Sequence, residues 1–204
     1  MNRKLVASDI HGNGATLIQL LNMASFSKHD RLYLLGDYVK KGPDSLGTIM
    51  LVKWLKEQMG TVVLRGNHED KWLSNQYGNM YPKLTPEWQM FLQSLPYWYE
   101  DEEYLFVHAG IRFGTALEEQ QVADLTAIRE EFYTYQNPLP KTIVFGHTQT
   151  DVLGANEGQI WKKEGKIGID TGAGQKKFLT LYDLTNRVSY RRPVLSLPHV
   201  ENRS

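Results

Sequence analysis

Short apolar runs alternate with amphipathic stretches through the first third of the chain. The runs at residues 4–8, 31–35 and 61–64 are rich in Leu and Val, and a glycine follows each of them within a few residues. Short apolar runs bounded in this way are typical of buried strands. Between them, apolar residues recur at helical spacing over residues 15–23 and 46–55. This strand–helix–strand–helix–strand order predicts a buried, largely parallel sheet and therefore an α/β fold.

The remaining chain returns to strands after an aromatic stretch. Residues 68–99 carry several Trp and Tyr and predict a small helical lobe, whose rings fit core packing better than stacking on a nucleobase. Further strands are expected at residues 104–107, 142–145, 166–169, 177–181 and 188–191, with a helix over 122–133. We expect one α/β (α+β) domain over residues 1–192 and a C-terminal tail over residues 193–204.

Polar side chains with metal-binding chemistry follow five of the predicted strands. In chain order they are Asp9 and His11, then Asp37, then Asn67 and His68, then His108, and finally His147. Ligands of open α/β sheets gather outside the carboxyl ends of the strands, so these side chains should converge. Glycines flank each of these loops, which allows the backbone to approach a metal or a phosphate closely.

Composition excludes several chemistries. The sequence has no cysteine, which rules out disulfides, thiolate metal sites and cysteine nucleophiles. Its 23 basic and 23 acidic residues balance, which argues against a nucleic-acid partner recognised through bulk positive charge. The apolar runs are too short for a signal peptide or a membrane span, so we expect a cytoplasmic protein without a membrane partner.

The donor set itself indicates a metal centre. Carboxylate, amide and imidazole ligands without sulfur suit manganese, iron or zinc. Two Asp, one Asn and three His are too many for one tetrahedral site, whereas six ligands with one bridging carboxylate suit two divalent metals about 3.5–4 Å apart. Such a pair generates hydroxide at neutral pH for attack on a phosphate ester. The competing interpretation is that these residues only cap helices and form turns, as Asp and Asn often do.

The sequence motifs that contain these residues resemble those of a known family. Their order, spacing and strand-end positions are similar to those of the calcineurin-like metallophosphoesterases, and within them to the bacterial and phage branch of the phosphoprotein phosphatases. The resemblance extends over residues 4–171. The motifs are Asp9-Ile10-His11-Gly12, Gly36-Asp37-Tyr38-Val39-Lys40-Lys41-Gly42, Gly66-Asn67-His68-Glu69, His108-Ala109-Gly110 and Phe145-Gly146-His147-Thr148.

The resemblance implies a role for each motif residue. Asp9 and His11 would bind the first metal ion, and Asp37 would bridge both ions. The second ion would be completed by Asn67, His108 and His147, with Asn67 also near the substrate. His68 would be the general acid that protonates the leaving oxygen. The implied fold has four layers, with two mixed β-sheets packed face to face and flanked by helices.

Two further residues are implied to contact the substrate phosphate. Arg129 matches an arginine that precedes a Glu-rich helical stretch in the family, although an arginine beside Glu130 and Glu131 is also typical of a solvated helix. Lys41 stands where the family usually has an arginine, and it keeps the charge while losing the bidentate fork. Lys40 and Lys41 could equally form a solvated loop.

Like Lys41, Lys40 departs from the family pattern. The residue usually found there is an aspartate that supports the acid histidine, so His68 lacks that partner in its expected place. A nearby cation would also lower the pKa of the histidine. His68 must therefore find another orienting group or act without one.

Three functions remain open at this stage. The leading prediction is a metal-dependent phosphomonoesterase that acts on phosphoserine or phosphothreonine in proteins, or on small phosphate esters. The alternative is a symmetrical diadenosine tetraphosphatase with the same metal centre, which the missing Asp-Arg pair and the aromatic lobe favour. The third is a catalytically silent module that binds metal, which the complete ligand set argues against.

Overall fold

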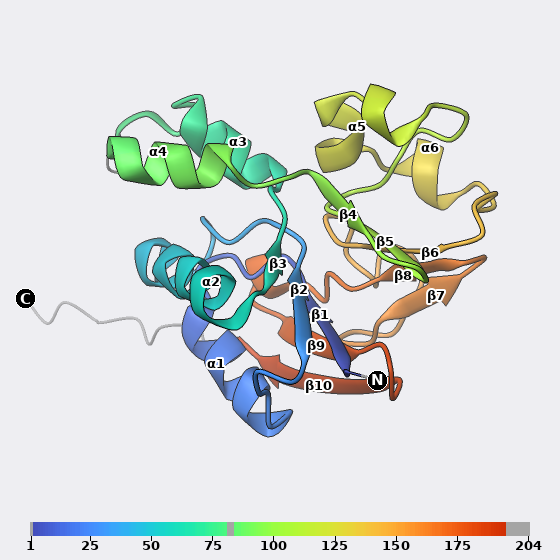
Figure 1. Cartoon of the computed structure of the whole chain (residues 1–204), viewed down its shortest axis with the longest axis horizontal. Coiled ribbons are helices and arrows are strands. Elements are labelled where there is room, and N and C mark those ends of the chain that lie inside the picture. Colours follow the sequence, from blue (N-terminus) through green and yellow to red (C-terminus); the bar gives the residue numbers. More distant parts are fainter. Residues whose placement is uncertain (1, 81–83, 195–204) are drawn as a thin grey trace, which may run out of the picture.

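Two five-stranded mixed sheets form the centre of the molecule (Figure 1). The computed structural model describes residues 2–80 and 84–194. The first sheet has the order β10-β9-β1-β2-β3 and the second has the order β4-β5-β6-β8-β7. Each sheet combines three neighbouring parallel strands with two antiparallel strands, which confirms the predicted pair of mixed sheets.

The parallel strands are the ones that the apolar runs predict. In the first sheet they are β1 (Lys4–Ala7), β2 (Arg31–Leu34) and β3 (Val62–Val63). Beside β1 lies the antiparallel strand β9 (Phe178–Asp183), and β10 (Val188–Pro193) pairs antiparallel with β9. In the second sheet they are β5 (Tyr104–Val107), β6 (Thr142–Phe145) and β8 (Lys166–Gly168), flanked by β4 (Trp98–Glu100) and β7 (Trp161–Lys163).

Helices cover the outer face of each sheet. The α-helices are α1 (Gly14–Met23), α2 (Ser45–Met59), α3 (Asn67–Leu73), α4 (Pro86–Gln93), α5 (Val122–Ala127) and α6 (Glu130–Tyr133), and the short 3-10 helices are η1 (Gly78–Met80), η2 (Leu117–Glu119) and η3 (Ala173–Gln175). The longest helix, α2, begins where the Asp44 carboxylate accepts the Gly47 N–H, and it ends at Gly60 in the left-handed region. Among the described residues, no helix is long and apolar enough to cross a membrane.

Three apolar clusters separate the four layers. The cluster between the sheets includes Val6 and Tyr33 from the first sheet and Phe106 and Val144 from the second. Tyr33 and Phe106 stack across this interface with ring centroids 4.0 Å apart. A second cluster joins the first sheet to α1 and α2, and a third joins the second sheet to α5 and α6. The four-layer arrangement that the resemblance implies is therefore confirmed.

The structure corrects three details of the predicted elements. Residues 98–100 form the edge strand β4 rather than the end of a helical lobe, and β7 at residues 161–163 was not expected. The helix expected over 122–133 is two short helices, because Ile128 is extended (φ −60°, ψ 148°) and Arg129 lies outside helical geometry (φ −134°, ψ −102°). Residues 195–204 of the predicted tail lie outside the described residues.

The stack between the sheets generates a stability prediction. Phe106→Ala removes a fully buried ring from the centre of the molecule and should lower the free energy of unfolding by about 3–5 kcal/mol in urea titrations. Met90→Ala, at a side chain that is 70% exposed on α4, is the control and should change it by less than about 0.5 kcal/mol. Equal stability of the two variants would contradict this packing of the sheets.

Candidate metal centre

The loops that follow the central strands run side by side and bond to one another through their backbones. The His11 N–H donates to the Asp37 carbonyl at 2.8 Å, and the Asp9 N–H donates to the Gly36 carbonyl at 3.1 Å. From the second sheet, the Gly146 N–H donates to the His108 carbonyl at 2.8 Å. The predicted convergence at the carboxyl ends of the strands is therefore present.

Left-handed backbone conformations are concentrated in these loops. Six non-glycine residues here have φ between +47° and +69°, namely Asp9, His11, Asp37, Lys40, Lys41 and His147. Such conformations cost about 1–3 kcal/mol each and persist where surrounding contacts over-determine them. Because these residues are grouped around the predicted ligands, we infer that the strained backbone is maintained to direct their side chains into the site.

Two glycines allow the carboxylates to approach the neighbouring loops. A Cβ on Gly146 would lie 2.2 Å from Asp9 Oδ2, and a Cβ on Gly66 would lie 2.3 Å from Asp37 Oδ1. Neither carboxylate could keep its position beside a larger residue. The Asp9 Oδ2 atom instead accepts the Ser8 hydroxyl at 2.7 Å and the His147 N–H at 2.9 Å.

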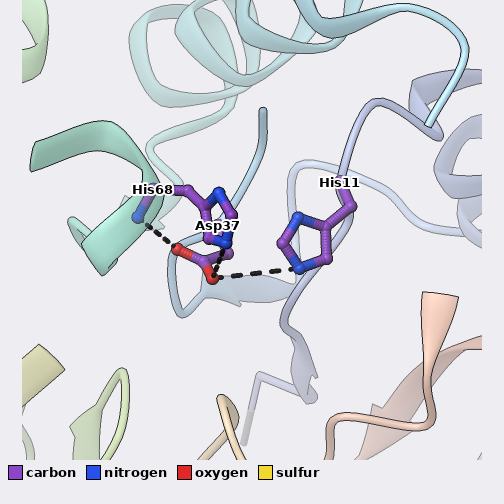
Figure 2. Close-up of side chains that lie close together, drawn as sticks. All are labelled: His11, Asp37 and His68. Atoms are coloured by element: carbon purple, nitrogen blue, oxygen red, sulfur yellow. Dashed lines mark hydrogen bonds and ion pairs between the residues drawn. The ribbon is translucent and has the colours of Figure 1, made fainter. Parts of the chain in front are cut away.

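Asp37 is the centre of the cluster, as Figure 2 shows for three of its members. Its Oδ1 accepts the backbone N–H of His68 at 2.9 Å. Its Oδ2 faces imidazole nitrogens from three different loops, with the Nε2 atoms of His11 and His68 both at 3.8 Å and that of His108 at 3.5 Å. One carboxylate oxygen is thus shared by both groups of candidate ligands, which are His11–Asp37–His68 and Asp37–His108–His147.

Backbone carbonyls fix the orientation of two imidazoles. The Val39 carbonyl lies 3.0 Å from His11 Nδ1, and the Leu35 carbonyl lies 2.8 Å from His108 Nδ1. A carbonyl can only accept, so each Nδ1 carries a proton and each Nε2 is the nitrogen that faces Asp37. This is the arrangement in which proteins hold histidine ligands of metals.

The environment of the Asn67 amide tests whether the site fits a cation. The atom placed as Oδ1 lies 3.2 Å from Asp37 Oδ2, 3.1 Å from His147 Nδ1 and 3.2 Å from His108 Nε2. Asp37 Oδ2 and His147 Nδ1 present lone pairs, and so does His108 Nε2 once it has lost its proton, so without a cation the opposite amide orientation would satisfy them better. Four converging acceptors of oxygen and imidazole type are the ligands that a hard or borderline divalent metal requires. The residues present therefore fit a metal ion.

The electrostatics of the cluster favour an ionised carboxylate at Asp37 and neutral imidazoles at His68 and His147. Burial alone would raise the pKa of Asp37, but the imidazoles of His108, His68 and His11 hold it well below its usual range. Burial lowers the pKa of His68 and of His147 to about 3. The carboxylate is ionised and these imidazoles are neutral at pH 7. Burial would also lower the pKa of His108, yet Asp37 raises it to about 10, so metal binding there displaces a proton.

Both predicted phosphate contacts lie at the edge of this cluster. The Arg129 Nη1 donates to the Thr148 hydroxyl at 3.3 Å, next to His147, from the break between α5 and α6 rather than from within a helix. The Lys41 Nζ lies 3.2 Å from His11 Nε2. These two cations come from different loops, and both residues are exposed.

Glu69, the last residue of the Gly66-Asn67-His68-Glu69 motif, has a structural role that the sequence pattern did not predict. The Glu69 carboxylate is fully buried and accepts three backbone N–H groups, from Asp37 and Tyr38 at 2.8 Å and from Gly66 at 3.0 Å. It thereby ties the Asp37 loop to the start of α3. Burial raises its pKa to about 8.

Comparison with known proteins identifies the family. The calcineurin-like phosphoesterase family model matches residues 3–174. The chain belongs to this family. Its members' requirement for divalent metal ions agrees with the ligand clusters around Asp37.

Relatives of this calcineurin-like chain carry two kinds of name. A symmetrical bis(5'-nucleosyl)-tetraphosphatase of Vibrio parahaemolyticus is 36% identical over 52% of this chain and 44% of its own length. The catalytic subunit of serine/threonine-protein phosphatase 6 of Caenorhabditis elegans is 36% identical over 36% of this chain and 23% of its own. The matched segments thus span less than half of either relative.

Solved structures share the fold. A crystal structure named "a putative diadenosine tetraphosphatase" has a TM-score of 0.79 and 24% identity, covering 96% of this chain and 95% of that one. A serine/threonine phosphatase of Saccharomyces cerevisiae has a TM-score of 0.66 and 14% identity, covering 97% and 82%. At these identities the likeness concerns the fold alone.

Removal of the Glu69 carboxylate tests how the cluster is held. Glu69→Ala leaves three buried N–H groups without their acceptor and should lower the free energy of unfolding by at least about 2 kcal/mol. Glu69→Gln keeps one acceptor oxygen and should lose less. Urea titrations measure both, with Glu87→Ala, at an exposed side chain on α4, as the control. If both Glu69 variants match the control, Glu69 does not hold these loops.

Proposed function

We propose that this chain is a binuclear metal-dependent phosphoesterase, which hydrolyses phosphoric monoesters with serine/threonine phosphoproteins as its leading substrate class. The observation that carries the proposal is the convergence of imidazole and amide groups from separate loops on Asp37 Oδ2. The two candidate clusters share this oxygen, which supports a bridging role. The relatives' names support phosphoester chemistry for proteins that share the motifs.

The proposed ligand assignment takes His11, Asp37, His108 and His147 from the two clusters and adds Asp9, whose Oδ1 lies 3.8 Å from His11 Nε2, and the Asn67 amide. Asp9 and His11 would hold one ion together with Asp37, and Asn67, His108 and His147 would hold the other, which leaves His68 free to act as the acid. The donor set lacks sulfur and includes carboxylate and amide oxygens, which favours manganese. Its imidazoles leave iron and zinc as alternatives. When bound, such ions supply Lewis-acid stabilisation of the charge that develops on the phosphoryl oxygens.

The remaining site residues act on the substrate itself. Arg129, next to Thr148, and Lys41, next to His11, neutralise and orient the phosphate, and the Asn67 amide contacts the substrate in addition to its metal ion. His68 holds its Nε2 toward Asp37, where it can give a proton to the leaving oxygen as the P–O bond breaks.

The second candidate is hydrolysis of symmetrical dinucleoside tetraphosphates. Several relatives carry that name, including the Vibrio parahaemolyticus enzyme, which supports this alternative. Lys41 in place of a bidentate arginine also weakens the argument for a single, tightly clamped phosphomonoester.

Parallel assays separate the two candidates. A phosphoserine peptide, an aryl phosphate and diadenosine tetraphosphate are compared by kcat/KM with added manganese. We expect the phosphomonoesters to be the better substrates. A preference for the dinucleotide by orders of magnitude would replace the leading substrate class, and no turnover of any of them with metal bound would contradict the proposed activity.

The bridging role predicts the behaviour of one variant. Asp37→Ala removes the oxygen that both clusters share, so it should abolish activity and reduce the content of both metal ions, measured by mass spectrometry of the dialysed protein. Asp124→Ala, which breaks the ion pair with Arg112 and touches none of the proposed ligands, is the control and should retain both ions. An active Asp37 variant with a full metal complement would refute the assignment.

A further inference from the structure

His68 has a hydrogen-bond partner that the family motif does not supply. The Tyr77 hydroxyl bonds to His68 Nδ1 from the loop between α3 and η1. The two rings lie at an interplanar angle of 29° with centroids 6.0 Å apart. His68 is buried and Tyr77 is half-buried, so little water competes for this bond.

We propose that Tyr77 is the positioning residue of His68 and replaces the carboxylate partner that acid histidines of this family usually have. The inference rests on the proposed function, because it assigns Tyr77 a part in the delivery of the proton by His68. Tyr77 acts through His68 and does not itself touch the substrate.

Lys40 occupies the position of the missing aspartate and faces Tyr77. Its Nζ lies 4.0 Å from the centroid of the Tyr77 ring, which is the geometry of a cation–π contact. Its backbone N–H donates to the Ser45 hydroxyl at 2.8 Å, which anchors the loop at the start of α2. The residue that departs from the family pattern thus holds the tyrosine in place.

A hydroxyl and a carboxylate select different protonation states of the imidazole. A carboxylate can only accept, so beside a neutral histidine it requires the proton on Nδ1 and leaves Nε2 bare. A phenol can donate its own proton to an unprotonated Nδ1, which leaves the imidazole proton on Nε2. In this chain Nε2 is the nitrogen that faces Asp37 and the proposed leaving oxygen. Tyr77 therefore allows a neutral His68 to present a transferable proton.

The first test is the dependence of rate on the leaving group. The parent, Tyr77→Phe and His68→Asn are compared on aryl and alkyl phosphates whose leaving groups range from good to poor. Tyr97→Phe is the matched control, because Tyr97 is also half-buried and its hydroxyl bonds to Asp70 in the same region. Tyr77→Phe should lower kcat about 10- to 100-fold for alkyl phosphates and less than about 3-fold for nitrophenyl esters, with KM unchanged.

The second test reads the tautomer without turnover. In zinc-loaded protein labelled with nitrogen-15 at histidine, the resonances of His68 are assigned by their loss in His68→Asn. The parent and Tyr97→Phe should show the proton on Nε2, and Tyr77→Phe should show a mixture of the two tautomers. A proton on Nδ1 in the parent, or an unchanged spectrum in Tyr77→Phe, would overturn the proposal.

The two tests distinguish failure of the inference from failure of the proposed function. If His68→Asn becomes steeply sensitive to the leaving group while Tyr77→Phe behaves like the parent or loses rate equally on all esters, His68 is the acid and Tyr77 does not position it. If His68→Asn shows no such sensitivity, the acid role of His68 fails and the positioning role of Tyr77 fails with it, whatever the tautomer.

Discussion

The carboxylate of Asp37 lies among side chains from three other segments of the chain, and the geometry of the site depends on its position. Its Oδ2 is within 3.8 Å of imidazole nitrogens of His11, His68 and His108, while its Oδ1 accepts the N–H that begins the next helix. Burial of an anion at such a point is unfavourable unless cations or donors surround it. The loops around Asp37 are therefore arranged to meet that requirement.

That arrangement lowers the conformational stability of the chain locally. Several non-glycine residues adopt left-handed conformations, and the buried Glu69 carboxylate is committed to holding three backbone N–H groups. These costs are offset by the apolar layers, in which two sheets pack face to face and helices cover their outer faces. The rigid strands fix where each loop begins, which restricts the backbone conformations that the strained loops can adopt.

The central strands and the convergence of the site residues could be predicted because both follow from local signals. Each buried strand is a continuous apolar run, and the carboxyl ends of parallel strands must meet at one edge. The edge strands β4 and β7 carry no such run and depend on pairing with β5 and β8. The bond from Tyr77 to His68 could not be predicted, since it depends on how an irregular loop after α3 folds back over the site.

Anomalous diffraction from crystals of the manganese-loaded protein would locate the metal ions relative to Asp37. We predict two peaks about 3.5–4 Å apart with the Asp37 carboxylate between them, one peak near Asp9 and His11 and the other near Asn67, His108 and His147. A single peak, or peaks that do not contact Asp37, would contradict a binuclear centre built on this carboxylate.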